Sequence, residues 1–254
     1  MTNDQHIISV ENLVKKFGSF VANDNLTFFV KKGEIFGFLG ANGAGKTTAI
    51  KILCGLWKPT SGSINVAGFD VYKQTEKIKK NIGYMSQKFS LYDDMTVAEN
   101  FTFYGGIYGL KTIKIKERMH VLLKKLGLEE YKDRVIGSLP LGWKQKLAFS
   151  IATIHEPAIV FLDEPTSGVD PVTRRQFWDM IYEAAHEGTT VFLTTHYMDE
   201  AEYCERVSIM VDGHIEALDT PAALKEQFGV GTMEEVFLKI ARKEVVIQDN
   251  NVTV

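Results

Sequence analysis

The stretch that decides the fold is EIFGFLGANGAGKTT, residues 34–48. Glu34–Leu39 predicts a strand, and the residues from Gly40 onward fit the pattern G-x-x-x-x-G-K-[ST]. Such glycines let backbone N–H groups turn inward around phosphates, and a helix that begins near Gly45 adds positive potential. The alternative is a chance glycine-rich turn. A strand before the loop and a helix after it are the context that a phosphate-binding loop requires.

The side chains of this loop have distinct expected roles. Lys46 is expected to reach the β- and γ-phosphates of a nucleotide, and the Thr47 hydroxyl to ligate Mg²⁺. Thr48 and the backbone around it complete the phosphate cradle, which comprises Gly40, Asn42, Gly43, Ala44 and Gly45. The sequence therefore predicts a nucleotide site with bound Mg²⁺.

A second motif places two carboxylates after an apolar strand, in Ile159–Glu164. At the carboxyl edge of a parallel sheet, Asp163 can hold the metal through water. Glu164 can reach the attacking water as general base. An Asp-Glu pair can also be a solvated turn, but the phosphate loop elsewhere in the chain favours the catalytic interpretation.

One histidine stands out because it follows a predicted strand. His196 comes directly after Thr190–Thr195, where it could hydrogen-bond a γ-phosphate and orient the attacking water. The remaining histidines are interpreted as structural, namely His6, His120, His155, His186 and His214. Cys54 and Cys204 are expected to be small core residues, since no His/Cys spacing suggests a metal site.

Composition sets the class of protein. The 254 residues, 45% hydrophobic and 24% charged, are ordinary for a soluble globular chain. A net charge of −3 gives no general electrostatic case for nucleic acid, so no nucleic-acid partner is expected. No apolar run approaches the ~18 residues of a membrane span, and residues 1–5 do not resemble a signal peptide. We expect a cytoplasmic chain whose membrane part, if it has one, belongs to another protein.

Strands alternate with helices along most of the chain, which predicts an α/β fold with a mostly parallel sheet. Further strands are expected at residues 7–14, at residues 26–30 and as a pair within 63–72 turning at Gly68. Helices are expected at 119–126, 143–155 and 171–187, and a hairpin at Asp212-Gly213. Residues 93–155 interrupt the alternation as an inserted helical subdomain.

These motifs, and their order along the chain, resemble those of the ATP-binding subunit of ABC transporters. The resemblance covers about residues 7–240. Gly40–Thr48 resembles its Walker A motif, Ile159–Glu164 its Walker B motif, and Ser167–Asp170 its D-loop. His196 is similar to the family's switch histidine. The resemblance implies ATP and Mg²⁺ as ligands. It also implies a P-loop NTPase core with a mostly parallel sheet, an antiparallel β-subdomain and an inserted α-helical subdomain.

The resemblance adds two site residues. Gln87 resembles the Q-loop glutamine, which contacts Mg²⁺ or water and senses the membrane partner. Phe17 occupies the position of the aromatic residue that stacks on adenine.

A division of the chain is also expected from the resemblance. Residues 1–242 would form one ATPase domain, with a core at 1–87 and 156–225. The helical subdomain would be 88–155, and a C-terminal helix 226–242. Residues 243–254 are expected to form a loosely ordered tail.

The family's signature sequence, usually LSGGQ, departs from its pattern here. It aligns with residues 139–143, where Pro140 replaces a Ser and so lacks both hydroxyl and N–H donors. Leu141 and Gly142 open the next predicted helix and would still face phosphate across a head-to-tail dimer. Either the chain forms a homodimer through these remaining amides, which we favour, or it pairs with a second ATPase that carries a complete signature.

The expected function is to hydrolyse ATP and power a separate membrane permease. Residues 91–100 and 233–238 resemble the drug- and polysaccharide-exporting branch, which implies export at the cytoplasmic face of a membrane. A groove for the permease's coupling helix would involve Phe89, Leu91, Tyr92, Phe101, Tyr104 and Tyr108, although at least half of these are expected in the core. A cluster at Lys111, Lys114, Lys116 and Arg118 is interpreted as a solvated face.

Two other functions fit these motifs less well. A soluble ABC-type regulatory or assembly ATPase usually carries extra domains or insertions, which are not evident here. A P-loop kinase or GTPase has no need of Gln87, Glu164 and His196 together, and no Asn-Lys-x-Asp tetrapeptide occurs.

Overall fold

The computed structural model describes residues 6–87 and 91–250, and a six-stranded sheet forms its centre. The strand order is β10-β9-β3-β8-β7-β6. The strands are β3 (Ile35–Gly40), β6 (Ile82–Met85), β7 (Ile159–Asp163), β8 (Thr190–Thr195), β9 (Arg206–Val211) and β10 (His214–Asp219). All neighbours are parallel except β9 and β10, which form a hairpin.

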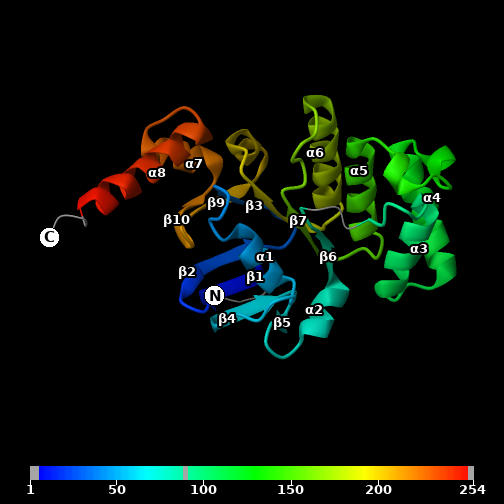
Figure 1. The fold of residues 1–254 in the computed structure, drawn as a ribbon, viewed down its shortest axis with the longest axis horizontal. Helices are drawn as coiled ribbons and strands as arrows, with labels where there is room; N and C mark the ends of the chain where they lie inside the picture. The colour runs from blue at the N-terminus through cyan, green and yellow to red at the C-terminus, as the bar shows by residue number, and fades with distance from the viewer. Residues whose placement is uncertain (1–5, 88–90, 251–254) are drawn as a thin grey trace.

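A second, antiparallel sheet has the order β2-β1-β4-β5. Its strands are β1 (His6–Phe17), β2 (Phe20–Lys31), β4 (Ser61–Val66) and β5 (Phe69–Asp70). The helices are α1 (Lys46–Leu53), α2 (Thr75–Asn81), α3 (Val97–Ile107), α4 (Thr112–Leu126), α5 (Leu141–Ala152), α6 (Pro171–His186), α7 (Pro221–Phe228) and α8 (Met233–Asn250). In Figure 1 the antiparallel sheet lies with α1 and α2 below the central strands, while α5 and α6 stand above them and α3 and α4 lie beyond α5. The expected fold class is confirmed.

The central sheet separates two hydrophobic layers because successive side chains of a strand point to opposite faces. Phe38 and Phe192 pack toward the antiparallel sheet, with ring centroids 5.3 Å apart. Their neighbours Leu39 and Leu193 pack toward the helices. The apolar runs noted in the sequence are therefore strands buried on both faces, which is typical of parallel sheets.

Several local predictions are confirmed. Asp170 caps α6 by accepting hydrogen bonds from the N–H groups of Val172 and Thr173, each at 3.0 Å. Gly127 ends α4 in the left-handed conformation, with φ 66°. Hairpin turns occur at Gly68 and at Asp212-Gly213. Cys54 and Cys204 are buried.

Other elements differ from the prediction. Strand β2 begins at Phe20 rather than residue 26, because pairing with β1 draws in polar residues such as Asn23. Helix α8 continues to Asn250, beyond the expected start of a tail at residue 243, and residues 251–254 lie outside the described chain. Arg118 is not part of a solvated face, since it pairs with Glu156 at 2.8 Å and donates to Ile154 O, whereas the three lysines of that cluster are exposed.

No helix within residues 6–87 and 91–250 combines the length and apolar character needed to span a membrane.

Strand β6 approaches α5 so closely that residue 83 has no room for a side chain. A Cβ on Gly83 would lie 2.1 Å from the carbonyl oxygen of Ala152. Gly83→Ala should therefore lower the free energy of unfolding by about 3 kcal/mol, measured by urea titration. Gly106→Ala is the matched control because a Cβ there meets nothing within 4 Å in α3, so it should stabilise by about 0.5–1 kcal/mol. Equal effects of the two substitutions would contradict this account.

His155 should make the fold sensitive to acid. Its ring stacks on Tyr108, its Nε2 lies 3.0 Å from Ile82 O, and burial lowers the pKa of His155 to about 4. The unfolded chain, with a His pKa of about 6.5, therefore binds a proton that the folded chain excludes. The free energy of unfolding should fall by up to about 3 kcal/mol as pH drops from about 6.5 to 4. His155→Gln should remove this part of the pH dependence in urea titrations, and an unchanged slope would refute it.

Candidate functional site

The phosphate-binding loop connects β3 to α1 and is held in place by the antiparallel sheet. Gly45 precedes α1 with φ 100°, and a Cβ there would lie 2.3 Å from Ala22 O. Asn23, fully buried in β2, donates from Nδ2 to Gly45 O at 3.1 Å. Glycine is thus required here both for its positive φ and for the close approach of β2.

Lys46 lies at the first position of α1 and is only 4% exposed. Its Nζ donates to Gly40 O at 2.7 Å and to Ala41 O at 3.0 Å, and lies 3.6 Å from Glu164 Oε1. Burial lowers the pKa of Lys46, and the nearby carboxylate of Glu164 opposes that shift. The Lys46 ammonium therefore lies between the phosphate loop and the carboxylate of Glu164.

Asp163 ends β7 and connects it to the loop and to β8. Its Oδ1 accepts from Thr47 Oγ1 at 3.1 Å and from Thr194 Oγ1 at 2.6 Å. Burial raises the pKa of Asp163, while the two hydroxyl donors work in the opposite direction. Hard oxygen donors of this kind are those that Mg²⁺ prefers, so Thr47 and Asp163 fit that ion.

Glu164 follows Asp163 and gathers three other side chains around its carboxylate. Besides Lys46, its Oε2 accepts from Gln87 Nε2 at 2.9 Å and lies 3.0 Å from His196 Nδ1. The residue is 7% exposed and adopts φ 49°, unusual for a residue other than glycine. Its N–H is bonded to both the carbonyl and the hydroxyl of Thr194, at 3.1 and 3.0 Å. These bonds fix the backbone turn that directs the carboxylate to its partners.

The structure thus brings together six side chains from the segments at the ends of β3, β6, β7 and β8: Lys46, Thr47, Gln87, Asp163, Glu164 and His196. The rest of the expected phosphate cradle lies at the end of β3, in the loop that follows and in α1: Gly40, Asn42, Gly43, Ala44, Gly45 and Thr48. Phe17 lies at the end of β1, where its exposed ring contacts Trp57. Leu141 and Gly142 begin α5, and their close neighbours belong to α6 and to the loop after β7.

A hydrogen bond connects the helix that follows the signature segment, α5, to the loop after β7 that contains Glu164. Pro140 caps α5, and Leu141 is 41% exposed at its first position. Gln145, buried in α5, donates from Nε2 to Ser167 O at 3.2 Å. In the same loop, Thr166 donates to the buried carboxylate of Glu200, beside Arg174. The loop after β7 is therefore bonded to both α5 and the segment that follows His196.

Two residues of the site were not predicted. Thr194 donates to Asp163 and accepts from Glu164, and its only signal was a hydroxyl in an apolar strand next to His196. Asn23 gave no signal, because its contact with Gly45 depends on how two distant segments pack.

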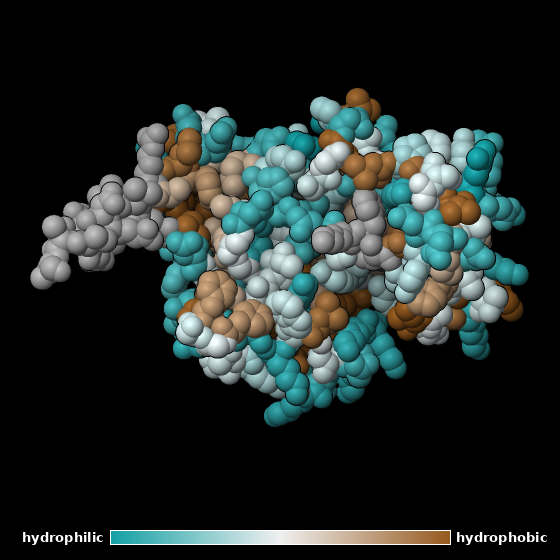
Figure 2. Space-filling view, viewed as in Figure 1, coloured by the Kyte–Doolittle hydropathy of each residue, from teal (hydrophilic) through white to brown (hydrophobic). Residues whose placement is uncertain are grey.

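The aromatic segment after Gln87 divides between core and surface. Leu91 and Phe101 are buried, Tyr104 and Tyr108 are half-buried, and Tyr92 is exposed; Phe89 lies outside the described residues. Phe103 and Ile107 of α3 are also exposed, and Figure 2 shows hydrophobic residues over that helix.

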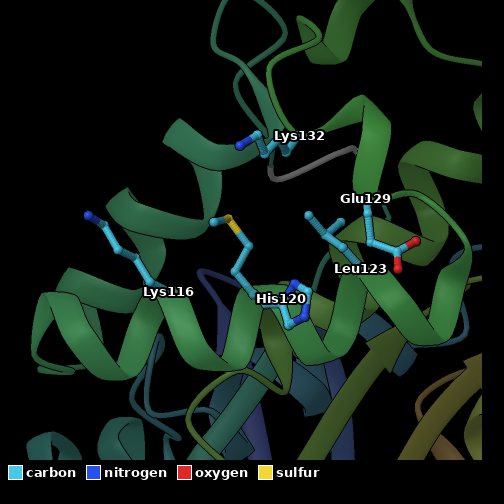
Figure 3. A pocket seen from close by; sticks show the side chains of 6 residues that line it. Lys116, His120, Leu123, Glu129 and Lys132 are labelled. Atoms are coloured by element: carbon cyan, nitrogen blue, oxygen red, sulfur yellow. The ribbon is translucent and has the colours of Figure 1, made fainter.

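A pocket of about 470 Å³ lies elsewhere, on the helical part of the molecule. In Figure 3, Lys116, His120 and Leu123 of α4 face Glu129 and Lys132 across it. The residues that line this pocket include none from the phosphate loop, and neither Asp163 nor Glu164.

Fold and site together define a P-loop nucleotide-binding protein. A family model described as ABC transporter matches residues 23–167. The chain belongs to the ABC transporter family and has the fold of its ATPase subunits.

Individual relatives agree with this. The chain is 46% identical over 244 residues to the probable multidrug ABC transporter ATP-binding protein YbhF of Escherichia coli, covering 94% of this chain and 42% of that protein. It is 35% identical over 252 residues to the linearmycin resistance ATP-binding protein LnrL of Bacillus subtilis, covering 96% and 81%. A solved ATP-binding subunit of an ABC transporter superposes with TM-score 0.84 at 28% identity, covering 92% and 99%. The chain thus spans about two fifths of the length of YbhF.

Thr194→Val should reveal how much the Asp163 carboxylate depends on its hydroxyl donor. Without it the ionised carboxylate loses a hydrogen bond, so the pKa of Asp163 rises further and stability falls by about 1–3 kcal/mol at neutral pH. The deficit should shrink as pH drops and Asp163 becomes protonated, measured by urea unfolding across pH. Thr195→Val is the matched control, since the Thr195 hydroxyl accepts from the Tyr197 N–H and is not a donor to Asp163 in the described structure. A deficit for Thr194→Val that is constant with pH would contradict this role.

Proposed function

We propose that this chain binds and hydrolyses ATP to power a separate membrane permease, in the direction of export. The observation that carries the proposal is the carboxylate of Glu164, bonded at once to Gln87 and His196 and paired with Lys46. A general base, a phosphate-binding cation and two orienting groups are the parts that hydrolysis of a phosphoanhydride needs.

Each residue has a role in this proposal. The N–H groups of Gly43–Gly45 and the N-terminus of α1 hold the phosphates, with Asn42, Ala44 and Thr48 completing the cradle. Lys46 donates to the β- and γ-phosphates. Glu164 accepts a proton from the attacking water, which Gln87 and His196 orient. Phe17 offers its ring to the adenine.

Mg²⁺ would be held by Thr47 and Asp163, with Gln87 beside them. Thr47 Oγ1 and Asp163 Oδ1 already lie 3.1 Å apart at the edge of the loop. The ion would neutralise charge on the β- and γ-phosphates.

The active unit in this proposal is a head-to-tail dimer of two copies. Leu141 and Gly142 begin α5, next to α6 and the loop after β7. In this dimer their amides would meet the nucleotide of the second copy. The first N–H groups of α5 have no side-chain cap, which leaves them available to a phosphate even though Pro140 supplies no donor.

The membrane partner would dock on the surface formed by Tyr92, Phe103 and Ile107, whose side chains are exposed and of which Tyr92 and Phe103 are in ring contact. That position would place the whole chain at the cytoplasmic face of the membrane. Relatives named for multidrug transport and linearmycin resistance support export. In this scheme residues 1–242 act as one ATPase domain, with 88–155 as its helical subdomain.

Substitutions at Glu164 and Lys46 test the catalytic part of the proposal. Glu164→Gln should lower kcat about 10²–10⁴-fold while Mg-ATP still binds, because only the proton acceptor is lost. Lys46→Ala should abolish binding in calorimetry. Glu183→Gln is the matched control, since this exposed carboxylate pairs with Lys125 on α4. Phosphate release and Mg-ATP titration measure both effects.

Two outcomes would refute the proposal. One is wild-type protein that shows no heat of association with Mg-ATP. The other is Glu164→Gln protein that hydrolyses ATP at the wild-type rate. Glu164→Gln protein that stays monomeric with ATP, as judged by light scattering, would refute the homodimer and favour a different second ATPase.

A further inference from the structure

Two aromatic rings meet at an exposed corner beside the phosphate loop. Phe17 and Trp57 make an edge-to-face contact, with ring centroids 5.3 Å apart and planes at 76°. Phe17 is 43% and Trp57 38% exposed. Large rings held in a fixed mutual geometry and yet open to solvent can receive a flat ligand.

The position of this corner relative to the phosphate loop follows from the register of β1 and β2. Phe17 is paired with Phe20, and two residues further along β2 is Ala22, whose carbonyl abuts Gly45. At about 3.3 Å per residue, the corner lies roughly 7–10 Å along the strand from the loop. A sugar and one phosphate can bridge that span, so the corner lies where the base of a loop-bound nucleotide would arrive.

Trp57 is attached to the same helix that begins at Lys46. Its N–H donates to Lys51 O at 3.1 Å, and the Lys51 ammonium lies over the Trp57 ring, 4.5 Å from the centroid. Lys51 belongs to the last turn of α1. The orientation of Trp57 is therefore fixed relative to Lys46 through one short helix.

Phe17, in contrast, has few constraints of its own. It lies at the last residue of β1, next to the turn at Gly18, and its side chain has no hydroxyl with which to form a hydrogen bond. Lys15 lies over its ring, 4.7 Å from the centroid, and donates to Lys58 O at 2.8 Å. The edge-to-face contact with Trp57 therefore restrains the orientation of the Phe17 ring.

We propose that Trp57 is a positioning residue that holds Phe17 as the platform for a purine base and so joins base recognition to phosphate recognition through α1. This inference rests on the proposed function, because it concerns the base of the same nucleotide. A platform that is already oriented loses less entropy when the base stacks. A purine offers a larger face than a pyrimidine, so the same corner favours ATP over CTP.

The test compares ligands with and without a base. Calorimetry with Mg-ATP, Mg-CTP and Mg-tripolyphosphate should show that Trp57→Ala weakens ATP binding about 5–10-fold, a loss typical of one stacking contact. Tripolyphosphate binding should be unchanged, and the preference for ATP over CTP should shrink. Trp57→Phe should recover most of the affinity, because a phenyl ring can still contact Phe17. Leu56→Ala is the matched control, since Leu56 is an exposed neighbour and should leave all three affinities unchanged.

The outcomes separate this inference from the proposed function. Trp57→Ala protein that binds ATP as tightly as wild type would overturn the role of Trp57 and leave the function standing. Equal loss of ATP and tripolyphosphate would also overturn it, because the damage would then be general. Wild-type protein that binds neither ligand would overturn the proposed function and this inference together.

Discussion

The buried carboxylate of Glu164 is the constraint on which the arrangement of the site depends. A charge removed from water is stable only when paired and hydrogen-bonded, and here the partners come from separate elements. Lys46 follows β3, Gln87 follows β6 and His196 follows β8, while Glu164 itself follows β7. The parallel order of these strands is what allows four loops to meet at one edge. A shift of β3, β6 or β8 would remove one of the three partners of this carboxylate.

The sequence predicted those parts of the site that are encoded within one short stretch. Residues 34–48 combine strand, loop and helix, and Asp163-Glu164 ends an apolar strand, so both could be recognised without knowledge of packing. Strand β6 was not predicted as a strand, because four residues containing Gly83 carry little periodicity. The long β2 was also missed in part, since Asn23 is a poor strand former that pairs with Lys15 of β1, and Asn25 lies at an irregularity of the strand with φ 51°. Local patterns identify chemistry, whereas edges and registers are set by distant partners.

The supporting residues of the site illustrate the same limit. Thr194 and Asn23 hold Asp163 and the phosphate loop, yet each is a single polar residue in a strand. Trp57 lies outside every motif, and its contact with Phe17 joins the end of β1 to the end of α1. Such residues acquire their importance from three-dimensional neighbours, so a structure is needed to find them. The signature segment differs from these residues, because Pro140 could be recognised from the sequence alone. The structure adds that α5 begins directly after it.

The close packing of β2 against Gly45 constrains the sequence even in relatives that no longer bind nucleotide. A side chain at that position would overlap Ala22 O, and one at Gly40 would approach Met210 O at 2.5 Å. These two glycines are therefore demanded by packing, independent of any phosphate. A descendant that had lost nucleotide binding would still be selected to keep them in order to fold. In such a pseudoenzyme, loss of the lysine or of the glutamate after β7 would record the lost activity, while the glycines would persist as a relic.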